Sequence, residues 1–511
     1  MTRFCLPLLL IFLLIPLNSR AEDPAPPVPS DGKCLVPADD QWTAQEKFVW
    51  EGVCRGQIAD FNEGPAYGGA LDPRNLQGLP PSRILRSSFV ETILLKDTYR
   101  RALTRQGVRV AGARFTEILD LQGADVGHDL AFFGCLFEHG ANLVRLKSAN
   151  ALFFNGSRLI DFLRMEQLHL GTGLFMSFAV LDNVLLSYAH VTDFVDLSGA
   201  SVTNHLGMHQ LRTGAKVWMQ HGRFAEINLV NAHIGGDVVL TGATVDGQVD
   251  ADGLEVQGGA LLGYAKFQGP VKLSSARIRG DVHLTDSELY QSVILRRAQI
   301  DGALFFGTEP KSKRVMLDLV NARADSIPGL ADAWPSKLEL EGFSYRSAEA
   351  AEAFEQWFAK LDHYAAQPYT QLASVVLAQG NNELATAIRY AGRDRERKEL
   401  KDWAPWIWLT ILWASIGYGY HVERALIWVV AFVVAGTVAL WFSEQSWRNG
   451  LRAWSDKIVY SIDMLLPIIK LREKDYQIDL KGSLGYYFYF HKIMGYVLAS
   501  FLIAGLSGLT K

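Results

Sequence analysis

The chain has 511 residues, of which 49% are hydrophobic and 20% charged, and its formal net charge is −4. This is the composition of an ordinary folded protein with a modest negative balance, and it gives no indication of a nucleic-acid partner.

The first 21 residues have the pattern of a secretory signal peptide. Arg3 precedes the apolar run LPLLLIFLLIPL, and NSRA follows before acidic residues, so we expect cleavage after Ala21. An uncleaved membrane anchor is the alternative, because Arg20 lies close to that site. Residues 22–39 are predicted to be a linker, which is Pro-rich and without core-forming residues in its first part.

Cys34 and Cys54 flank one short predicted helix, QWTAQEKFVWEGV. In an exported protein a disulfide between them is the favoured interpretation, and two buried free thiols are the alternative. Cys5 leaves with the signal peptide, and Cys135 occupies an inward repeat position, where we expect a small core residue. The chain has no CxxC motif or Cys/His cluster, so a zinc or redox site is not expected.

Residues 40–105 are predicted to be helical, because SRILRSSFVETILL and DTYRRALTRQG place apolar residues at helical spacing. They precede a repeat array whose first coil would otherwise expose unpaired backbone groups. We therefore predict that this segment is a helical N-terminal cap.

Residues 106–345 are organised around a pattern that returns every eleven residues. Its clearest copies read FVDLSGASV, DVVLTGATV, PVKLSSARI and SVILRRAQI, and its apolar pairs V-x-L and A-x-I have strand spacing. The register holds from Leu121 to Phe306, apart from two steps of ten that end at Leu186 and Leu229. Eleven residues make half a coil, so we predict a right-handed parallel β-solenoid of about 22 residues per coil and roughly nine coils. Met208 and Met219 should face inward, although their units are the least regular.

These repeats resemble those of pentapeptide-repeat proteins, whose four-sided coils use A-(D/N)-L-x-x units; the period here is five plus six rather than five plus five. The wider chain is similar to a group of bacterial membrane proteins often labelled membrane-associated oxidoreductases. The resemblance is carried by RSSFVETILL, GVRVAGARF, LELEGFSY, QPYTQLASVVLAQG, SIGYGY, YSIDMLLPII and YVLASFLIAGLSGL. It implies a mainly β solenoid joined to a helical membrane region. The oxidoreductase label finds no support in any residue of the chain.

An enzyme is a weaker interpretation, held as the second alternative. Parallel β-helix lyases and hydrolases line one face with stacked carboxylates, whereas the outward residues of V-x-L in one set of alternate units are of mixed polarity. These are Asp120, Asn142, Arg164, Leu185, Gly207, Asn228, Asp250, Lys272 and Ile294. The sequence has no HExxH, nucleotide-binding loop, G-x-S-x-G or dinucleotide fingerprint. We expect no catalytic residue, no cofactor and no metal ligand.

The outward residues of the other alternate units are predicted to share one face. They are Ala131, Phe153, Phe175, Asp196, Trp218, Val239, Leu261, His283 and Phe305, of which seven are apolar. An exposed strip of this size would be sticky unless something binds it. Either the terminal helices fold back over it, or it forms a dimer seam or a partner groove. Its candidate interaction residues are Phe153, Phe175, Trp218, Val239, Leu261 and Phe305.

Residues 346–401 return to helical patterns with Pro and Gly punctuation, and their second half resembles one helical hairpin of the tetratricopeptide kind. The charge run RDRERKELK is interpreted as a solvated helix face, with a lipid-binding patch as the alternative.

Residues 402–511 are predicted to be a membrane domain with two or three transmembrane helices. Segments 425–442 and 486–509 are long and apolar enough to cross a bilayer core of ~30 Å. Segment 403–420 is Trp-rich and could span, re-enter or lie at the surface, while 458–469 is short and is predicted to be interfacial or re-entrant. Lys/Arg-rich stretches on both sides leave the topology open.

SIGYGY resembles the T-x-G-Y-G filter of potassium channels, which follows a Trp-rich pore helix and precedes an inner helix. The candidate pore-loop residues are Ser415, Gly417, Tyr418 and Gly419. Ser replaces the usual Thr, Tyr420 stands where an acid is usual, and no outer helix precedes the segment. A plain interfacial turn is the other interpretation.

The sequence thus predicts a bacterial cell-envelope protein held in the inner membrane, with its solenoid on the periplasmic side. The expected function is binding or scaffolding, and an ion channel is the first alternative. The expected partners are the lipid bilayer and an unidentified protein or polymer on the solenoid, with homo-oligomerisation left open.

Overall fold

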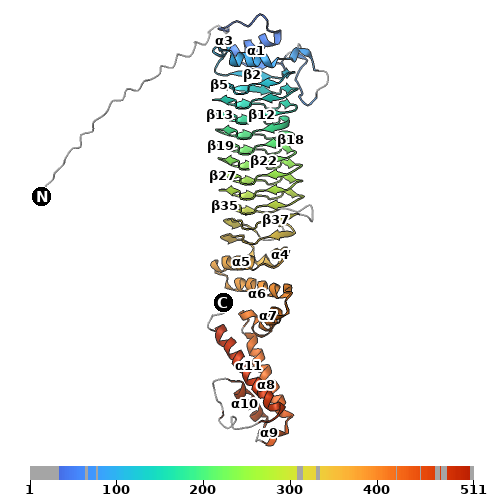
Figure 1. The fold of residues 1–511 in the computed structure, drawn as a ribbon, viewed down its shortest axis with the longest axis vertical. Coiled ribbons are helices and arrows are strands. Elements are labelled where there is room, and N and C mark those ends of the chain that lie inside the picture. Colours follow the sequence, from blue (N-terminus) through green and yellow to red (C-terminus); the bar gives the residue numbers. More distant parts are fainter. Residues whose placement is uncertain are drawn as a thin grey trace, which may run out of the picture.

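The computed structural model describes residues 34–63, 67–75, 79–307, 315–329, 334–421, 423–448, 451–466, 472 and 480–506. The predicted signal peptide and the first part of the linker lie outside these residues. Figure 1 shows a rod of stacked strands with helices at its two ends. The rod is a parallel β-solenoid of about ten coils with roughly 22 residues each, so the predicted coil length is confirmed and the predicted number of coils is one too low.

Each coil contributes short strands to four walls, which we name A to D in chain order. Wall A is an 11-stranded sheet. Its strands are β1 (Ala59–Asp60), β2 (Val108–Ala111), β6 (Leu130–Phe133), β10 (Leu152–Phe153), β14 (Leu174–Phe175), β17 (Val195–Asp196), β20 (Val217–Trp218), β24 (Val238–Val239), β28 (Ala260–Leu261), β32 (Val282–His283) and β36 (Leu304–Phe305).

Walls B and C belong to one 18-stranded sheet, because β15 (Val180–Leu185) and β18 (Ser201–Gly207) run through both of them. The other strands of wall B are β3 (Arg114–Phe115), β7 (Leu136–Phe137), β11 (Arg158–Leu159), β21 (Arg223–Phe224), β25 (Thr244–Val245), β29 (Lys266–Phe267) and β33 (Glu288–Leu289). Those of wall C are β4 (Leu119–Asp120), β8 (Ala141–Asn142), β12 (Leu163–Arg164), β22 (Ile227–Asn228), β26 (Val249–Asp250), β30 (Val271–Lys272), β34 (Val293–Ile294), β37 (Met316–Asp318) and β39 (Lys337–Glu339).

Wall D is a nine-stranded sheet. Its strands are β5 (Asp125–Val126), β9 (Lys147–Ser148), β13 (His169–Leu170), β16 (His190–Val191), β19 (Arg212–Thr213), β23 (His233–Ile234), β27 (Glu255–Val256), β31 (Arg277–Ile278) and β35 (Gln299–Ile300). A last irregular coil adds the pair β38 (Ser326–Ile327) and β40 (Ser347–Ala348), so the solenoid ends slightly beyond the predicted boundary at 345.

The corner within each eleven-residue unit is made by one residue with positive φ. Seventeen successive units have it, and they are centred on Gly123, Gly134, Arg145, Gly156, Gln167, Phe178, Tyr188, Gly199, Gln210, His221, Asn231, Gly242, Gly253, Tyr264, Ser275, Asp286 and Arg297. The corner is closed by a backbone hydrogen bond, as from Ala124 N to Leu121 O at 3.1 Å. Only glycine adopts this conformation without a steric cost, and eleven of the seventeen units have another residue there.

The inward side chains form one continuous core along the rod. Met208 and Met219 have no exposed surface, which confirms the register in the irregular units. The two ten-residue steps have one structural cause: the corner between walls B and C is one residue shorter in those coils. The strands of these two walls start five residues apart at Arg158 and Leu163, but four apart at Arg223 and Ile227. Cys135 is a buried free thiol whose pKa burial raises to about 12, in agreement with its predicted core role.

The N-terminal cap consists of α1 (Ala44–Cys54), η2 (Pro81–Arg83), α2 (Ser87–Leu95) and α3 (Asp97–Arg100). It is not entirely helical, because its strand β1 pairs with β2 and begins wall A. The buried Glu46 closes a capping box with Thr43 and receives two hydrogen bonds from Arg86, at 2.6 and 2.7 Å. Burial works against the charge on Glu46, but the Arg86 and Thr43 contacts outweigh it and lower the pKa of this carboxyl.

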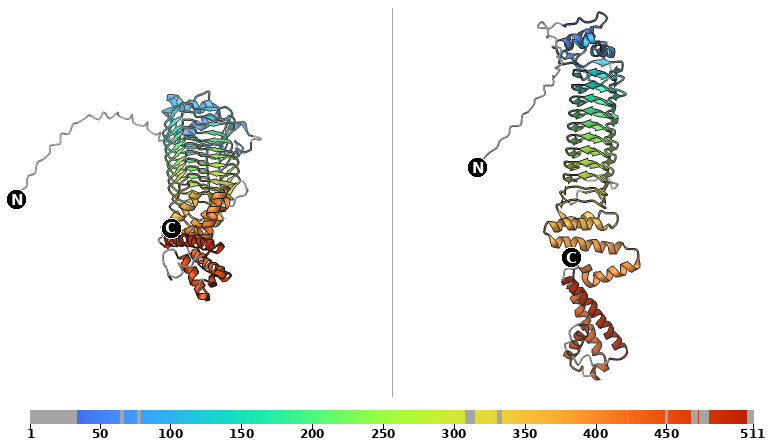
Figure 2. Two further views of the ribbon diagram at one scale, coloured as in Figure 1. Left: turned by 60° about the horizontal axis from the view of Figure 1, so that its bottom comes forward. Right: turned by 60° about the vertical axis from the view of Figure 1, so that its left-hand side comes forward.

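Beyond the last coils the chain is helical. The elements are η3 (Ala351–Ala353), α4 (Phe354–Phe358), α5 (Ala366–Ala378), α6 (Asn382–Glu399), α7 (Trp403–Ile416), η4 (Gly417–Gly419), α8 (Glu423–Trp441), α9 (Glu444–Arg448), α10 (Trp454–Leu465) and α11 (Ser483–Leu506). Helices α5 and α6 form a hairpin across the end of the rod, as Figure 2 shows. Among the described helices, α8 alone is long and apolar enough by composition to cross a membrane, with a mean hydropathy of 2.0.

Candidate binding surfaces

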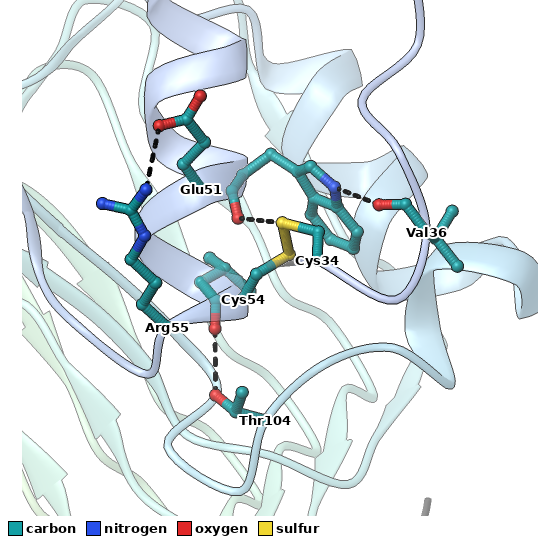
Figure 3. The surroundings of a disulfide bond; sticks show 8 residues. Cys34, Val36, Glu51, Cys54, Arg55 and Thr104 are labelled. Atoms are coloured by element: carbon teal, nitrogen blue, oxygen red, sulfur yellow. Dashed lines mark hydrogen bonds and ion pairs between the residues drawn. A yellow bond between two sulfur atoms is a disulfide. The ribbon is translucent and has the colours of Figure 1, made fainter. Parts of the chain in front are cut away.

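Cys34 and Cys54 are joined in a disulfide, as the sequence predicted, with Cα atoms 5.1 Å apart (Figure 3). The bond ties the segment at Cys34 to the C-terminal end of α1. On one side of it, Trp50 Nε1 donates a hydrogen bond of 2.9 Å to the Val36 carbonyl. On the other, the Thr104 hydroxyl donates one of 3.0 Å to the carbonyl of Val53. The disulfide therefore stabilises the cap.

The predicted outward strip lies on wall A. The strand register aligns Phe153 with Phe175, then Asp196, and Trp218 with Val239 and Leu261, one residue per coil. The same column continues through His283 to Phe305, and in the other direction through Ala131 to Arg109 of β2. The structure thus brings all six candidate interaction residues onto one face.

Aromatic rings stack along this column. The centroids of Phe153 and Phe175 are 4.5 Å apart with nearly parallel planes, and those of His283 and Phe305 are 4.2 Å apart. Phe194 lies 5.0 Å from both Phe175 and Trp218, so it continues the ladder past the coil that presents Asp196. Stacking leaves the rings of the ladder half-buried rather than fully exposed.

No described helix covers wall A. Figures 1 and 2 show α1 to α3 beyond one end of the rod and α4 to α11 beyond the other. The expectation that the terminal helices fold back over the strip is therefore wrong for the described part of the chain. The helices close the open ends instead, where unpaired strand edges would be exposed.

Walls B and C carry charges that are paired from one coil to the next. The N–O distances are 2.9 Å for Arg223–Asp246 and 3.6 Å for Lys272–Asp250. The other pairs of this kind are Arg114–Glu138, Lys266–Glu288 and Arg296–Asp318. These pairs compensate most of the outward cations of the two walls, and they agree with the mixed polarity predicted for wall C.

Wall D has a different composition. Its outward column reads Asp125, Lys147, His169, His190, Arg212, His233, Glu255, Arg277 and Gln299, and a bridge extends it to Arg323. A groove of about 530 Å³ lies over its middle coils. It is lined by His190, Thr192, Arg212, Gly214, His233 and Gly235, among others.

The predicted pore-loop residues lie together between α7 and α8. The Ser415 hydroxyl donates to the Ile411 carbonyl at 2.6 Å inside α7, and Gly417 ends this helix in the left-handed conformation. Tyr418 and Gly419 also have positive φ, and the Tyr418 hydroxyl accepts a 2.9 Å hydrogen bond from Arg397 Nε of α6. In the single chain the segment is a tight turn between two helices. Its role in ion conduction stays a prediction.

Several ionisable side chains are buried among the C-terminal helices. Lys457 of α10 lies 5.0 Å from the ring of Trp441 and 5.1 Å from that of Trp447. His491 of α11 contacts the Ser461 carbonyl at 3.0 Å, and Gly436 of α8 leaves room for the Ser461 hydroxyl. These contacts join α8, α10 and α11 into one bundle.

Sequence reasoning missed wall D and Phe194. It followed the outward residue of V-x-L in both sets of alternate units, and these columns are walls A and C. The outward residue of A-x-I, followed in the same way, would have given the column from Asp125 to Gln299. The sequence pattern did not identify Phe194 because this residue lies at a corner, two residues before the position that the period assigns to wall A.

In comparisons with known proteins, no family model, no curated protein and no solved structure matches the chain.

Proposed function

We propose that this protein is a membrane-anchored scaffold of the bacterial cell envelope, whose solenoid projects on the periplasmic side and joins a second copy of the chain through wall A. The observation that carries the proposal is the aromatic and aliphatic column of wall A, which no described part of the chain covers.

The anchoring part of the proposal rests on the helices beyond the rod. Most of the large hydrophobic side chains that the structure exposes lie on them. They include Trp403, Trp408, Ile427, Val430, Val434, Phe442, Tyr486, Tyr489, Ile493 and Ile503. An apolar surface of this extent suits contact with lipid. Helix α8, with 19 residues, is ~28 Å long, close to the ~30 Å of a bilayer core, whereas the 14 residues of α7 reach only ~21 Å.

The second copy is inferred from the size and charge of wall A. Nine coils at ~4.8 Å make the column ~40 Å long, and a wall of five or six residues is ~17 Å wide. The product of roughly 700 Å² per partner approaches the ~800 Å² of a standard stable interface. Flanking it along one edge is an uncharged polar column of Asn155, Ser177, Ser198, Gln220 and Thr241. Interface cores are depleted of charge in the same way.

The test is the oligomeric state of the purified full-length chain in a neutral detergent. Trp218→Glu places a charge at the centre of wall A and should convert a dimer into a monomer in sedimentation experiments. Tyr188→Glu is the matched control, because this side chain is 51% exposed at the corner between walls C and D, away from wall A. A monomeric wild type, or equal dissociation by both variants, would contradict the proposal.

Asp196 allows a sharper test. Two copies anchored in one membrane meet in parallel about a two-fold axis, so each residue of wall A faces its own counterpart. The two Asp196 carboxylates then lie opposite each other, and like charges at such positions are destabilising. Asp196→Asn should therefore tighten the dimer, and a weaker dimer would show that the two walls do not meet coil to coil.

A further inference from the structure

The cations of the solenoid fall into two groups. Those outside wall D and its corners pair with a carboxylate or donate to a backbone carbonyl, as Arg223 does with Asp246 and Arg158 with the carbonyl of Arg74. Six others have no ion pair or side-chain hydrogen bond with any other described residue. They are Arg145, Lys147, Arg212, Arg279, Arg297 and Arg323, and all six are exposed.

All six unpaired cations lie on wall D or at its two edges. Lys147, Arg212 and Arg323 belong to its outward column. Arg145 and Arg297 are the positive-φ residues at the corner that leads into the wall, and Arg279 follows strand β31 at the corner that leads out of it. The described cations of the other walls have partners, as Arg223 and Arg158 do, whereas these six have none within the described part of the chain. The positive charge thus forms one line along the rod.

Arg212 is the centre of this line. Its neighbours in the column are His190 and His233, on the coils before and after it. Glu255, one coil further on, is the nearest carboxylate of the column, and it is already engaged by His233 at 3.2 Å and Arg277 at 3.1 Å. The guanidinium of Arg212 therefore keeps its five donors and its charge available to an anionic ligand.

The groove beside Arg212 is open because two glycines, Gly214 and Gly235, form its floor. A Cβ on Gly214 would lie 2.0 Å from the carbonyl oxygen of Thr192, and one on Gly235 would lie 2.2 Å from that of Gly214. Successive coils are therefore in contact at this corner, and no side chain fills the space above them. The hydroxyl of Thr192 donates to the Leu170 carbonyl at 2.9 Å, so it faces the groove as an acceptor.

The opposite edge of wall D presents neutral hydrogen-bonding groups. The positive-φ corners of four successive coils are Gln167, Tyr188, Gln210 and Asn231, and all are exposed. Amide side chains both donate and accept hydrogen bonds, which matches the hydroxyl groups of a sugar. Tyr188 is 51% exposed and offers a ring face on which a sugar can stack.

We propose that wall D binds an extended acidic polysaccharide, with a carboxylate held by Arg212 in the groove between His190 and His233. The unpaired cations occur on some coils and not on others, over a length of ~40 Å at ~4.8 Å per coil. This spacing fits a polymer whose charges are separated by neutral hydroxylated units. A polymer with a charge on every unit would meet long stretches of wall D without a cation. The site is independent of the contact through wall A.

The test is binding of fluorescently labelled hyaluronate, which carries a carboxylate on alternate sugars, to the full-length chain in a neutral detergent, with dextran and polyphosphate as comparison polymers. Hyaluronate should bind, dextran should not, and polyphosphate should bind more weakly than the glycan. Arg212→Glu should weaken binding at least roughly tenfold, which corresponds to the loss of one charge-assisted hydrogen bond.

Arg223→Glu is the matched control, because it makes the same charge change on wall B of the same coil and should leave binding within about twofold. Three results would each overturn the proposal: no binding of hyaluronate at low salt, tighter binding of polyphosphate, or equal loss in the two variants. Trp218→Glu should leave glycan binding unchanged, so a failure at wall A and a failure at wall D are told apart.

Discussion

Walls A and D are built from the same coils and mostly from two-residue strands, yet the side chains on their outer surfaces differ in chemical character. On neighbouring strands of one coil, wall D presents Arg212 and wall A presents Trp218, while Val217 and Met219 point into the core without exposed surface. The fold is set by the inward columns, which are apolar apart from a few hydroxyl side chains such as Ser148 and Thr213. The outward columns are left free to differ from wall to wall, and this is where function can reside.

Walls B and C differ from both, because most of their outward charges are paired. Most of their cations pair with carboxylates on adjacent coils, as Lys272 does with Asp250, while Arg158 donates to the Arg74 carbonyl. Exposed pairs of this kind contribute only ~0–1 kcal/mol to stability. Their effect is to leave these two walls without an excess of either charge, in contrast to the apolar column of wall A and the free cations of wall D.

The largest expected loss of stability comes from a charge placed at an inward position such as Met219. Met219→Asp buries an unpaired charge and should lower the free energy of unfolding by roughly 3–5 kcal/mol, measured by denaturant titration of the full-length chain. Gln220→Asp adds the same charge one residue further along, at a position that is not buried, and should cost less than ~1 kcal/mol. Near-wild-type stability of Met219→Asp would show that the register is wrong there.

Removal of the disulfide in the cap should have the next largest effect on stability. The double variant Cys34→Ala with Cys54→Ala opens a loop with a sequence separation of 20 and should destabilise the cap by ~3 kcal/mol. The fluorescence of Trp42 and Trp50 follows this transition, because both rings lie in the cap core. A reductant should lower the midpoint of the wild type and leave that of the double variant unchanged. A reductant with no effect on the wild type would exclude the bridge.

The smallest expected effect on stability comes from a substitution at a corner between two walls. Ser275 has φ of 58° between walls C and D, so Ser275→Gly should relieve the left-handed strain and stabilise the rod by about 0.5–1 kcal/mol. Ser274→Gly is the control, because Ser274 does not have positive φ and glycine there adds only unfolded-state entropy. Stabilisation by both changes, or by neither, would contradict this account of the corner.

The sequence predicted the solenoid well because its period is physical: residues that share a wall recur with the length of a coil. That period alone predicts Phe175, Trp218 and Leu261 on one face. It could not show that Phe194 fills the gap beside Asp196, since a corner residue has no fixed direction. Nor could it show which cations lack partners, because Arg212 and Arg223 have the same local sequence pattern and differ only in the residues of the next coil.

The central claim is that the outward column of wall A joins two copies coil to coil, and oxidative cross-linking tests it most directly. Leu261→Cys places a thiol in the outward column of wall A, and Tyr188→Cys places one at an exposed corner between walls C and D. In full-length protein within membranes, mild oxidation should link Leu261→Cys into a covalent dimer and leave Tyr188→Cys monomeric. Cross-linking of neither variant, or of both to the same extent, would contradict the account.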